Sequence, residues 1–419
     1  MWHTARALRR CPPAAPVENR TASRPRPTGS AVTRHTVLQV IPELQTGGAE
    51  RTTVDIAAAL VAAGHRALVA SAGGRLVTEL EAVGARHIRL PLSAKSPVAM
   101  WRNMRALKRL ILSEGIDLVH ARSRAPAWSA LWAASACDVP FVTTYHGIYG
   151  QKNAAKAFYN SVMARGDAVI ANSRYTAELI ARRHPFARDR ITVIPRGSDL
   201  AALAPDAVTA ERRQALATRW GLPSDAPVIL NLARLTNWKG QTVLVEALAR
   251  LAATSDRPWT AVLAGDDQGR GDYREKLQAQ IGDTGLEGRV RIVGHCDDVP
   301  AALALADLAV VASIEPEAFG RAAVEAQAAR VPVIATDLGA APETVLAPPD
   351  VAEDERTGWR VPPGDPQAMA TAIATALALD DTARKTLTQR AARHVTELYS
   401  LEAMCARTLA VYDRLLAEV

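Results

Sequence analysis

The stretch EPEAFGRAAVE runs from Glu315 to Glu325, and its glutamates Glu317 and Glu325 lie eight positions apart. Glu317 lies in a loop that ends at Gly320, and a helix is expected from about Arg321, which places Glu325 one turn inside it. Two carboxylates held apart in this way can each accept hydrogen bonds from a separate pair of hydroxyls, as in a ligand with a sugar at one end and a ribose at the other. The free N–H groups at the helix start favour phosphate or sugar oxygens. The spacing alone also fits one capping glutamate and one surface glutamate.

A second charged group lies in NLARLTNWKGQ, where Arg234 and Lys239 follow a predicted strand. A guanidinium and an ammonium five residues apart suit a diphosphate, because the first binds as a planar fork and the second as a point charge. Gly265 and Asp266 follow the next strand, in a turn of the kind that often borders a nucleotide. Asp267 completes an acidic pair with Asp266, but no further acids are in range to complete a hard-metal shell, so no metal site is expected.

His120 ends a predicted strand in LVHARSR. With Arg122 and Arg124 it can contact an anionic acceptor at the edge of a cleft. A histidine at a strand end equally fits a structural role, and the residues alone leave both interpretations open.

These residues must be positioned by elements that alternate between strand and helix from Thr36 onward. Such alternation predicts a parallel sheet covered on both faces. A seam near residues 200–223 separates two series, so the predicted fold class is α/β, with two Rossmann-like doubly wound domains that face each other across a cleft. The predicted parts are a disordered basic tail over residues 1–34, a first domain over 35–200, a second domain over 201–395, and a C-terminal helix over 396–419 that can pack back on the first domain.

The net charge of +7 is concentrated at one end of the chain. Residues 1–34 carry seven arginines and one glutamate, which leaves only +1 for the rest, so the charge does not indicate a nucleic-acid-binding fold. The four cysteines are widely spaced, which predicts unpaired thiols in a reducing, cytoplasmic compartment. No uninterrupted apolar run is long enough to span a bilayer.

Several ordered motifs resemble those of the retaining GT-B glycosyltransferases of the large family 4. EPEAFGRAAVEAQAARVPVIATDLGAAPETV resembles that family's signature, and GGAER, TTYHG, VIANS, VIPRGSDL and LARLTNWKG resemble its other motifs in the same order. The family often has a glycine where Arg330 stands, which leaves the local turn open. The resemblance covers nearly the whole predicted folded chain.

That resemblance implies a role for each matching residue. The donor is expected to be a sugar linked to a nucleoside diphosphate, with UDP or GDP favoured, and no other cofactor is expected. Glu317 would bind the transferred sugar, and His146 would lie beside the reacting carbon; these two are the expected catalytic residues. The resemblance implies donor binding by Arg234, Lys239, Phe319, Gly320 and Glu325, and an acceptor and phosphate loop with Gly47 and Gly48. The residues themselves add Gly265 to the expected donor site and His120 to the expected acceptor site.

The resemblance further implies transfer to a saccharide or a lipid-linked acceptor, in lipopolysaccharide or envelope polysaccharide synthesis. The helix MWRNMRALKRLIL has Trp101 and Met104 on a predicted apolar face and cations on the other, so it fits either core packing or docking on an anionic membrane. The alternatives are an epimerase of nucleotide sugars with the same fold and a protein that binds a sugar nucleotide without catalysis. A dehydrogenase is disfavoured, since no G-x-G-x-x-G follows the first strand.

Overall fold

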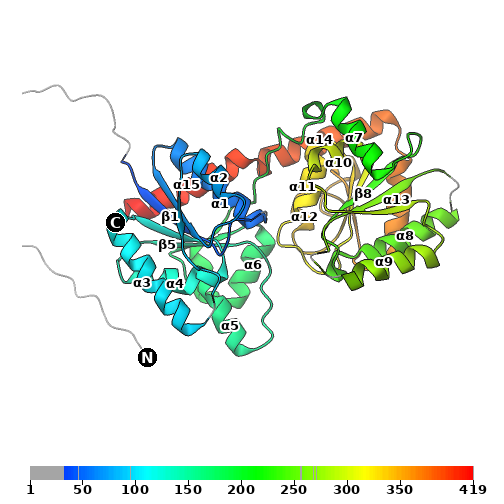
Figure 1. The fold of residues 1–419 in the computed structure, drawn as a ribbon. Coiled ribbons are helices and arrows are strands. Elements are labelled where there is room, and N and C mark those ends of the chain that lie inside the picture. Colours follow the sequence, from blue (N-terminus) through cyan, green and yellow to red (C-terminus); the bar gives the residue numbers. More distant parts are fainter. Residues whose placement is uncertain are drawn as a thin grey trace, which may run out of the picture. The chain divides into compact units, whose positions relative to one another are not determined.

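The computed structural model describes residues 33–45, 47–94, 96–254, 257–267, 269 and 271–418. The basic tail expected over residues 1–34 therefore lies almost entirely outside the described residues. The rest contains two parallel sheets, each flanked by helices (Figure 1). The predicted α/β class with two Rossmann-like domains is confirmed.

The first sheet has seven strands in the order β3-β2-β1-β4-β5-β6-β7. Its parallel strands are linked through helices, as the alternation predicted. The order reverses direction between β1 and β4, which is the point where ligands of doubly wound sheets bind, beyond the carboxyl ends of the strands. The strands are β1 (Thr36–Val40), β2 (Arg66–Ser71), β3 (Arg86–Arg89), β4 (Leu118–Ala121), β5 (Phe141–Tyr145), β6 (Ala168–Ala171) and β7 (Ile191–Val193).

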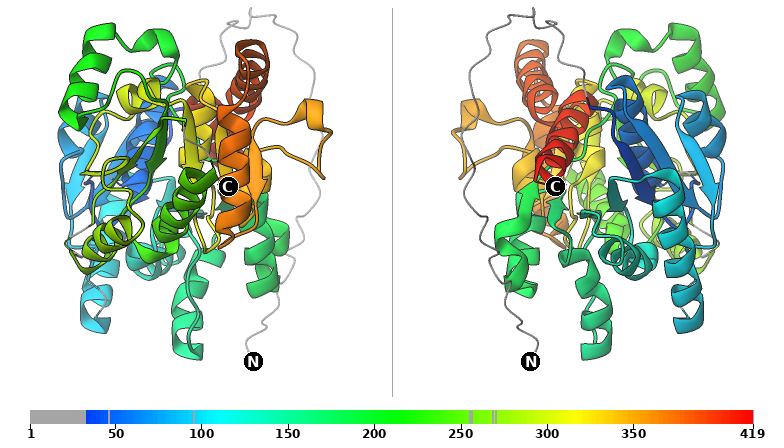
Figure 2. Two further views of the ribbon diagram at one scale, coloured as in Figure 1. Left: turned by 90° about the vertical axis from the view of Figure 1, so that its right-hand side faces the viewer. Right: turned by 90° about the vertical axis from the view of Figure 1, so that its left-hand side faces the viewer.

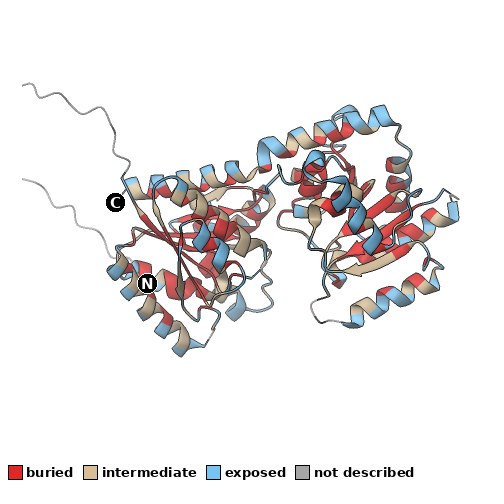
Figure 3. Ribbon diagram, turned by 45° about the horizontal axis from the view of Figure 1, so that its top comes forward, coloured by how far each residue is buried: buried red, intermediate tan, exposed pale blue. Residues whose placement is uncertain are grey.

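Successive residues of the strands face opposite cores, because side chains alternate across a strand. Val37 packs into one apolar cluster with α1, α2 and the C-terminal helix α15 (Leu401–Ala417), whereas Leu38 packs into another with α3, α4 and α6. Both faces of the sheet are thus buried, as Figure 3 shows by the colour of the strands. The helices before the seam are α1 (Gly48–Ala62), α2 (Val77–Ala82), α3 (Pro97–Glu114), α4 (Arg124–Ser135), α5 (Ala154–Asn160) and α6 (Arg174–Arg183).

The second sheet has six parallel strands in the order β10-β9-β8-β11-β12-β13. Its direction of order reverses between β8 and β11, the equivalent position to that in the first sheet. The residues after these two strands are the charged groups that the sequence singled out. The strands are β8 (Val228–Leu232), β9 (Thr260–Ala264), β10 (Val290–Gly294), β11 (Leu308–Val311), β12 (Val333–Thr336) and β13 (Trp359–Val361).

The helices of the second half also bury both faces of its sheet. The seam is not a bare linker, since it contains α7, whose Leu216 and Trp220 are buried in the second core. The helices are α7 (Ala210–Trp220), α8 (Gln241–Thr254), α9 (Gly271–Asp283), α10 (Val299–Leu305), α11 (Arg321–Ala328), α12 (Ala341–Thr344), α13 (Pro366–Leu377), α14 (Asp381–Tyr399) and α15 (Leu401–Ala417).

The C-terminal helix packs in the core of the first sheet. Figures 1 and 2 show the chain running through α14 and then α15, drawn from orange to red. Met404, Val411 and Leu415 of α15 join the same apolar cluster as Val54 of α1. The helix expected from residue 396 begins at Leu401 instead, because Ser400 has extended backbone and caps α15 by accepting a hydrogen bond from the N–H of Ala403.

The helix predicted at MWRNMRALKRLIL is α3, but its buried face differs from the expected one. Leu107 and Ile111 are buried, together with Asn103. Trp101 was expected on that face but is 51% exposed, with the Arg105 guanidinium 4.6 Å from its ring centroid. The core covers a narrower stripe of α3 than the apolar pattern suggested. No helix in the described part of the chain is long and apolar enough to cross a bilayer.

Candidate functional site

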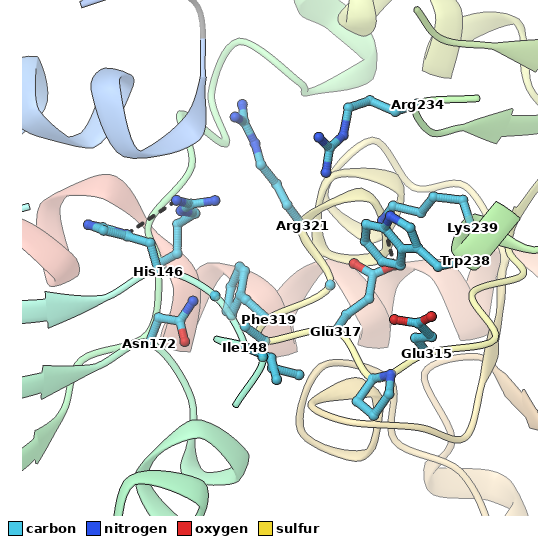
Figure 4. A pocket seen from close by; sticks show the side chains of 16 residues that line it. His146, Ile148, Asn172, Arg234, Trp238, Lys239, Glu315, Glu317, Phe319 and Arg321 are labelled. Carbon is cyan, nitrogen blue, oxygen red and sulfur yellow. Dashed lines mark hydrogen bonds and ion pairs between the residues drawn. The ribbon is translucent and has the colours of Figure 1, made fainter. Parts of the chain in front are cut away.

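A pocket of about 640 Å³ lies at the carboxyl ends of strands from both sheets (Figure 4). From the second sheet it receives the segment after β8 and the loop between β11 and α11. From the first sheet it receives residues that follow β5, β6 and β7. The lining thus comes from loops whose backbone is fixed by parallel strands, a usual place for ligand-binding residues in this class of fold.

Lys239 and Glu317 form an ion pair on the wall of this pocket. Their Nζ and Oε1 atoms are 2.7 Å apart, and both side chains are about 15% exposed. The hydroxyl of Ser313 also donates to Glu317 Oε1. Lys239 Nζ lies 4.2 Å from the ring centroid of Trp238, a favourable cation–π distance. The pair leaves the rest of the Glu317 carboxylate and the lysine free to meet a ligand in the pocket.

Arg234 lines the pocket beside the same tryptophan, with its guanidinium 5.9 Å from the Trp238 ring centroid. Among the described residues, no carboxylate lies within ion-pair distance of Arg234. A planar cation that faces a pocket without a partner is suited to a phosphate.

Hydrogen bonds to its backbone carbonyls fix the loop from Glu315 to Gly320 on both sides. The N–H of Ala340 donates to the carbonyl of Glu317 at 3.0 Å, and the hydroxyl of Ser173 donates to the carbonyl of Ala318 at 2.6 Å. Gly320 has a φ of 83°, the left-handed region that favours glycine, and α11 starts directly after it, where the sequence predicted. No side chain caps α11, so its first N–H groups remain available beside the pocket.

His146 follows β5 and lines the pocket opposite this loop. The guanidinium of Arg196 donates toward its Nδ1 at 3.4 Å, which leaves the proton of the neutral ring on Nε2. Nε2 is buried and has no hydrogen-bond partner in the described structure. Burial, with further effects of Arg122 and Arg196, holds the pKa of His146 well below its usual value. The ring is therefore neutral near pH 7.

Phe319 and Gly320 line the pocket as expected, but other predicted site residues do not. Gly265 lies behind the wall, where its N–H donates to the carbonyl of Gly294 at 2.7 Å. Glu325 is 8% exposed, and Arg321 Nε donates to its Oε1 at 2.6 Å.

Gly47 and Gly48 stand at the start of α1, just outside the pocket lining. Gly47 is the N-cap residue, and no side chain caps this helix. A Cβ atom on Gly48 would lie 2.6 Å from Nη1 of Arg196, so the absence of a side chain lets the guanidinium lie against the helix start. These glycines thus border the pocket through Arg196.

The expectation that His120 contacts an acceptor is wrong. The expected contact with an acceptor is not available to it, because the residue is 0% exposed and lies outside the pocket. Its Nδ1 is 2.6 Å from the hydroxyl of Tyr412, and its Nε2 is 2.7 Å from Oγ1 of Thr144. The structural interpretation is the right one, and it depends on α15, from which Tyr412 reaches the first sheet.

The turn at Arg330, whose conformation the sequence left open, is defined in the structure. Its φ of 57° lies in the left-handed region, and its N–H donates to the carbonyl of Gln327 at 3.1 Å. The turn that a glycine would favour is therefore kept with an arginine in its place.

The sequence analysis missed other pocket residues, among them Arg196, Arg321 and Asn172. Each stands in or next to a stretch that the sequence singled out. Arg196 lies in VIPRGSDL, Asn172 lies in VIANS, and Arg321 directly follows Gly320. A search for polar residues at every strand end would have found Arg196 and Asn172. Arg321 was noted only as the start of a helix.

Comparison with known proteins agrees with this geometry. The model for Glycosyltransferase Family 4 matches residues 46–202, and the model for Glycosyl transferases group 1 matches residues 212–394. The D-inositol 3-phosphate glycosyltransferase of Xylanimonas cellulosilytica is 33% identical over 318 residues, which are 72% of this chain and 72% of that protein. The chain belongs to glycosyltransferase family 4.

Two further family members extend the likeness over more of the chain. The phosphatidyl-myo-inositol mannosyltransferase of Mycolicibacterium smegmatis is 30% identical over 378 residues, which cover 88% of this chain and 90% of that one. The crystal structure of a glycosyltransferase from Rickettsia africae superposes with a TM-score of 0.83 at 34% identity, covering 92% of this chain and 99% of that chain. The GT-B fold of this family 4 glycosyltransferase is thereby established, and the epimerase and binding-only alternatives are not favoured.

Proposed function

We propose that this family 4 glycosyltransferase transfers a sugar, with retention of configuration, from a UDP-sugar or GDP-sugar to a phosphate-bearing polyol or its lipid-linked form. The observation that carries the proposal is the Lys239–Glu317 pair beside Arg234 on one pocket wall. The two cations suit the donor diphosphate and the carboxylate suits the hydroxyls of the transferred sugar. Glu325, inside α11, is assigned to the nucleotide ribose.

The chemical step needs little beyond positioning and charge. The acceptor hydroxyl oxygen bonds to the anomeric carbon, the bond from that carbon to the β-phosphate oxygen breaks, and the hydroxyl proton passes to the leaving phosphate. Arg234, Lys239 and the N–H groups at the start of α11 stabilise the charge that grows on the diphosphate. His146, which lines the pocket, is assigned to a position beside the anomeric carbon. This assignment uses no metal.

The acceptor is proposed from the relatives. The two named enzymes act, by their names, on an inositol phosphate and on a phosphatidylinositol. Both acceptors carry a phosphate on a polyol. A role in lipopolysaccharide synthesis, expected from the sequence, has no such support, and we therefore favour the phosphorylated polyol.

Contact with a membrane surface is part of this proposal if the acceptor is a lipid. Trp101 and Leu112 of α3 are exposed, and Arg105, Lys108 and Arg109 lie along the same helix. Exposed aromatic residues next to cations suit the interface of an anionic bilayer. A cytoplasmic location fits the unpaired Cys137, Cys296 and Cys405.

The experiment that tests the donor site is the thermal stability of the purified protein with UDP, GDP, ADP or CDP, each with Mg²⁺ and with EDTA. A ligand that binds only the folded state raises the melting temperature. We expect a rise with UDP or GDP that survives EDTA and is lost in Lys239→Ala. A rise that needs Mg²⁺ would contradict the metal-free assignment, and no rise with any nucleotide would contradict the donor site.

A further inference from the structure

Two cationic side chains of the pocket are not assigned to the donor diphosphate. Arg196, Arg234, Lys239 and Arg321 line it, against the carboxylates of Glu315 and Glu317. Lys239 is paired with Glu317, and Arg234 with Lys239 is assigned to the diphosphate. Arg196 and Arg321 therefore remain without an assigned ligand.

The carboxylates of Glu50 and Glu325 attract the Arg196 guanidinium without forming an ion pair with it. Among the described residues, no carboxylate lies within ion-pair distance of its guanidinium, and its Nε is buried without a hydrogen-bond partner. The start of α1 lies against Nη1 of Arg196, since a Cβ atom on Gly48 would be only 2.6 Å from that nitrogen. The first N–H groups of α1 have no side-chain cap, and the Glu50 carboxylate lies in the same first turn.

Arg321 comes from the other wall of the pocket. It is the first residue of α11, and only its Nε is used by Glu325, so its two terminal amino groups are available. Figure 4 shows its side chain extended between Arg234 and His146. Burial, together with the nearby positive charges of Arg321 and Arg122, lowers the pKa of Arg196 to about 10. Because the two guanidiniums repel each other, an anion between them stabilises the charged form of both.

A small cavity beside Arg196 limits where such an anion fits. This cavity of about 20 Å³ is lined by Arg122, His146, Asn172 and Arg196 among others. Arg122 is 3% exposed, and it donates from Nη2 to Thr52 while its Nε has no partner. The space holds about one water molecule. A phosphate must therefore lie on the pocket side, where Arg196 and Arg321 both face it.

We infer that Arg196 and Arg321 form a second anion subsite, which binds the phosphate monoester of the acceptor beside His146 and apart from the diphosphate at Arg234 and Lys239. The nature of the ligand as an acceptor rests on the proposed function, whereas the phosphate site itself does not. A dianion held by two guanidiniums fixes the polyol ring, so that a neighbouring hydroxyl faces the anomeric carbon.

The first test separates the two anion sites by removing one of them. In the variant Arg234→Gln/Lys239→Ala, calorimetric titration with inorganic phosphate should still show saturable binding. Adding Arg196→Gln or Arg321→Gln should weaken that binding at least tenfold, and adding Arg250→Gln, an exposed cation on α8, should leave it unchanged. No saturable binding, or equal binding after the Arg196 and Arg321 changes, would overturn the subsite. Circular dichroism melts check that each variant is folded, and the exposed Arg321 provides the test if Arg196→Gln unfolds.

The second test concerns the acceptor. With D-myo-inositol 3-phosphate, Arg196→Gln and Arg321→Gln should each raise the acceptor KM at least tenfold. The stabilisation by nucleotide should be unchanged in Arg196→Gln, which leaves the Arg321–Glu325 pair intact. If the wild type transfers no sugar to this acceptor but binds phosphate as described, the acceptor proposal fails and the subsite stands. If transfer occurs and the KM is unchanged in Arg196→Gln and Arg321→Gln, the subsite fails and the proposed function stands.

Discussion

Lys239 Nζ and Glu317 Oε1 lie 2.7 Å apart although 78 positions separate the two residues in the chain. The pair joins the segment after β8 to the loop after β11, the two strands between which the order of the second sheet reverses. Each residue thus has two functions, since it holds its partner in place and also faces the pocket.

Removing either member of this pair should abolish transfer in a folded protein. We expect Lys239→Ala and Glu317→Ala each to lower kcat/KM at least about 100-fold, the usual loss when a group that stabilises the transition state is removed. Only Lys239→Ala should also reduce stabilisation by nucleotide, because Glu317 is assigned to the sugar. Steady-state kinetics with melting curves tests this, and wild-type turnover in either variant would remove the assigned role.

Two glycines should respond in opposite ways to alanine. At Gly265 an added Cβ would meet the backbone carbonyl of Ala233, which cannot move without disturbing β8, so Gly265→Ala should cost about 1–3 kcal/mol of unfolding free energy. At Gly48 the Cβ would meet the end of the flexible Arg196 side chain, so Gly48→Ala should fold normally and bind inorganic phosphate more weakly. Urea unfolding and calorimetry give both quantities. Equal destabilisation by the two changes would contradict this distinction.

Burial of His120 should make the protein less stable in weak acid. Burial holds the pKa of His120 well below its usual value, so the unfolded chain takes up a proton as the pH falls below about 6.5 and the folded protein does not. This contribution to stability is present above that pH and is lost below it. Between pH 8 and pH 5.5, unfolding free energy should fall by about 1 kcal/mol more in the wild type than in His120→Gln.

Asp55 acts in the opposite direction and must be considered in the same measurement. Burial raises the pKa of Asp55 to about 6, so in the folded protein it binds a proton as the pH falls through that value, which offsets part of the loss. Because both proteins contain Asp55, the comparison of urea midpoints isolates the histidine. Parallel pH curves would show that His120 does not contribute.

Glu343 should stabilise the structure through the start of α6. Its carboxylate accepts hydrogen bonds from the N–H groups of Arg174 at 2.8 Å and Tyr175 at 2.7 Å, where a negative charge favours a helix. We expect Glu343→Ala to lower the unfolding free energy by about 1–2 kcal/mol. The exposed Glu246, paired with Arg250 on one helix face, is a matched control that should cost less than about 0.5 kcal/mol.

The sequence predicted the sheets and one wall of the pocket well, for physical reasons. Strands buried on both faces appear as apolar runs, and the residues after β8 and β11 stand next to such runs, so Arg234, Lys239 and Glu317 were found. The other wall depends on contacts between distant segments. Arg196 meets His146 across 50 positions, and His120 is buried because Tyr412 approaches it from 292 positions away. No local pattern carries that information.

The packing of α15 has a consequence for the order in which the protein is made. The cluster around Val54 of α1 includes Met404, Val411 and Leu415, so one face of the first sheet is incomplete until more than 200 further residues have left the ribosome. The second half must therefore be synthesised while the first still exposes apolar surface, a state in which nascent chains are prone to aggregate. Such a nascent chain would depend on chaperones until its last helix emerges.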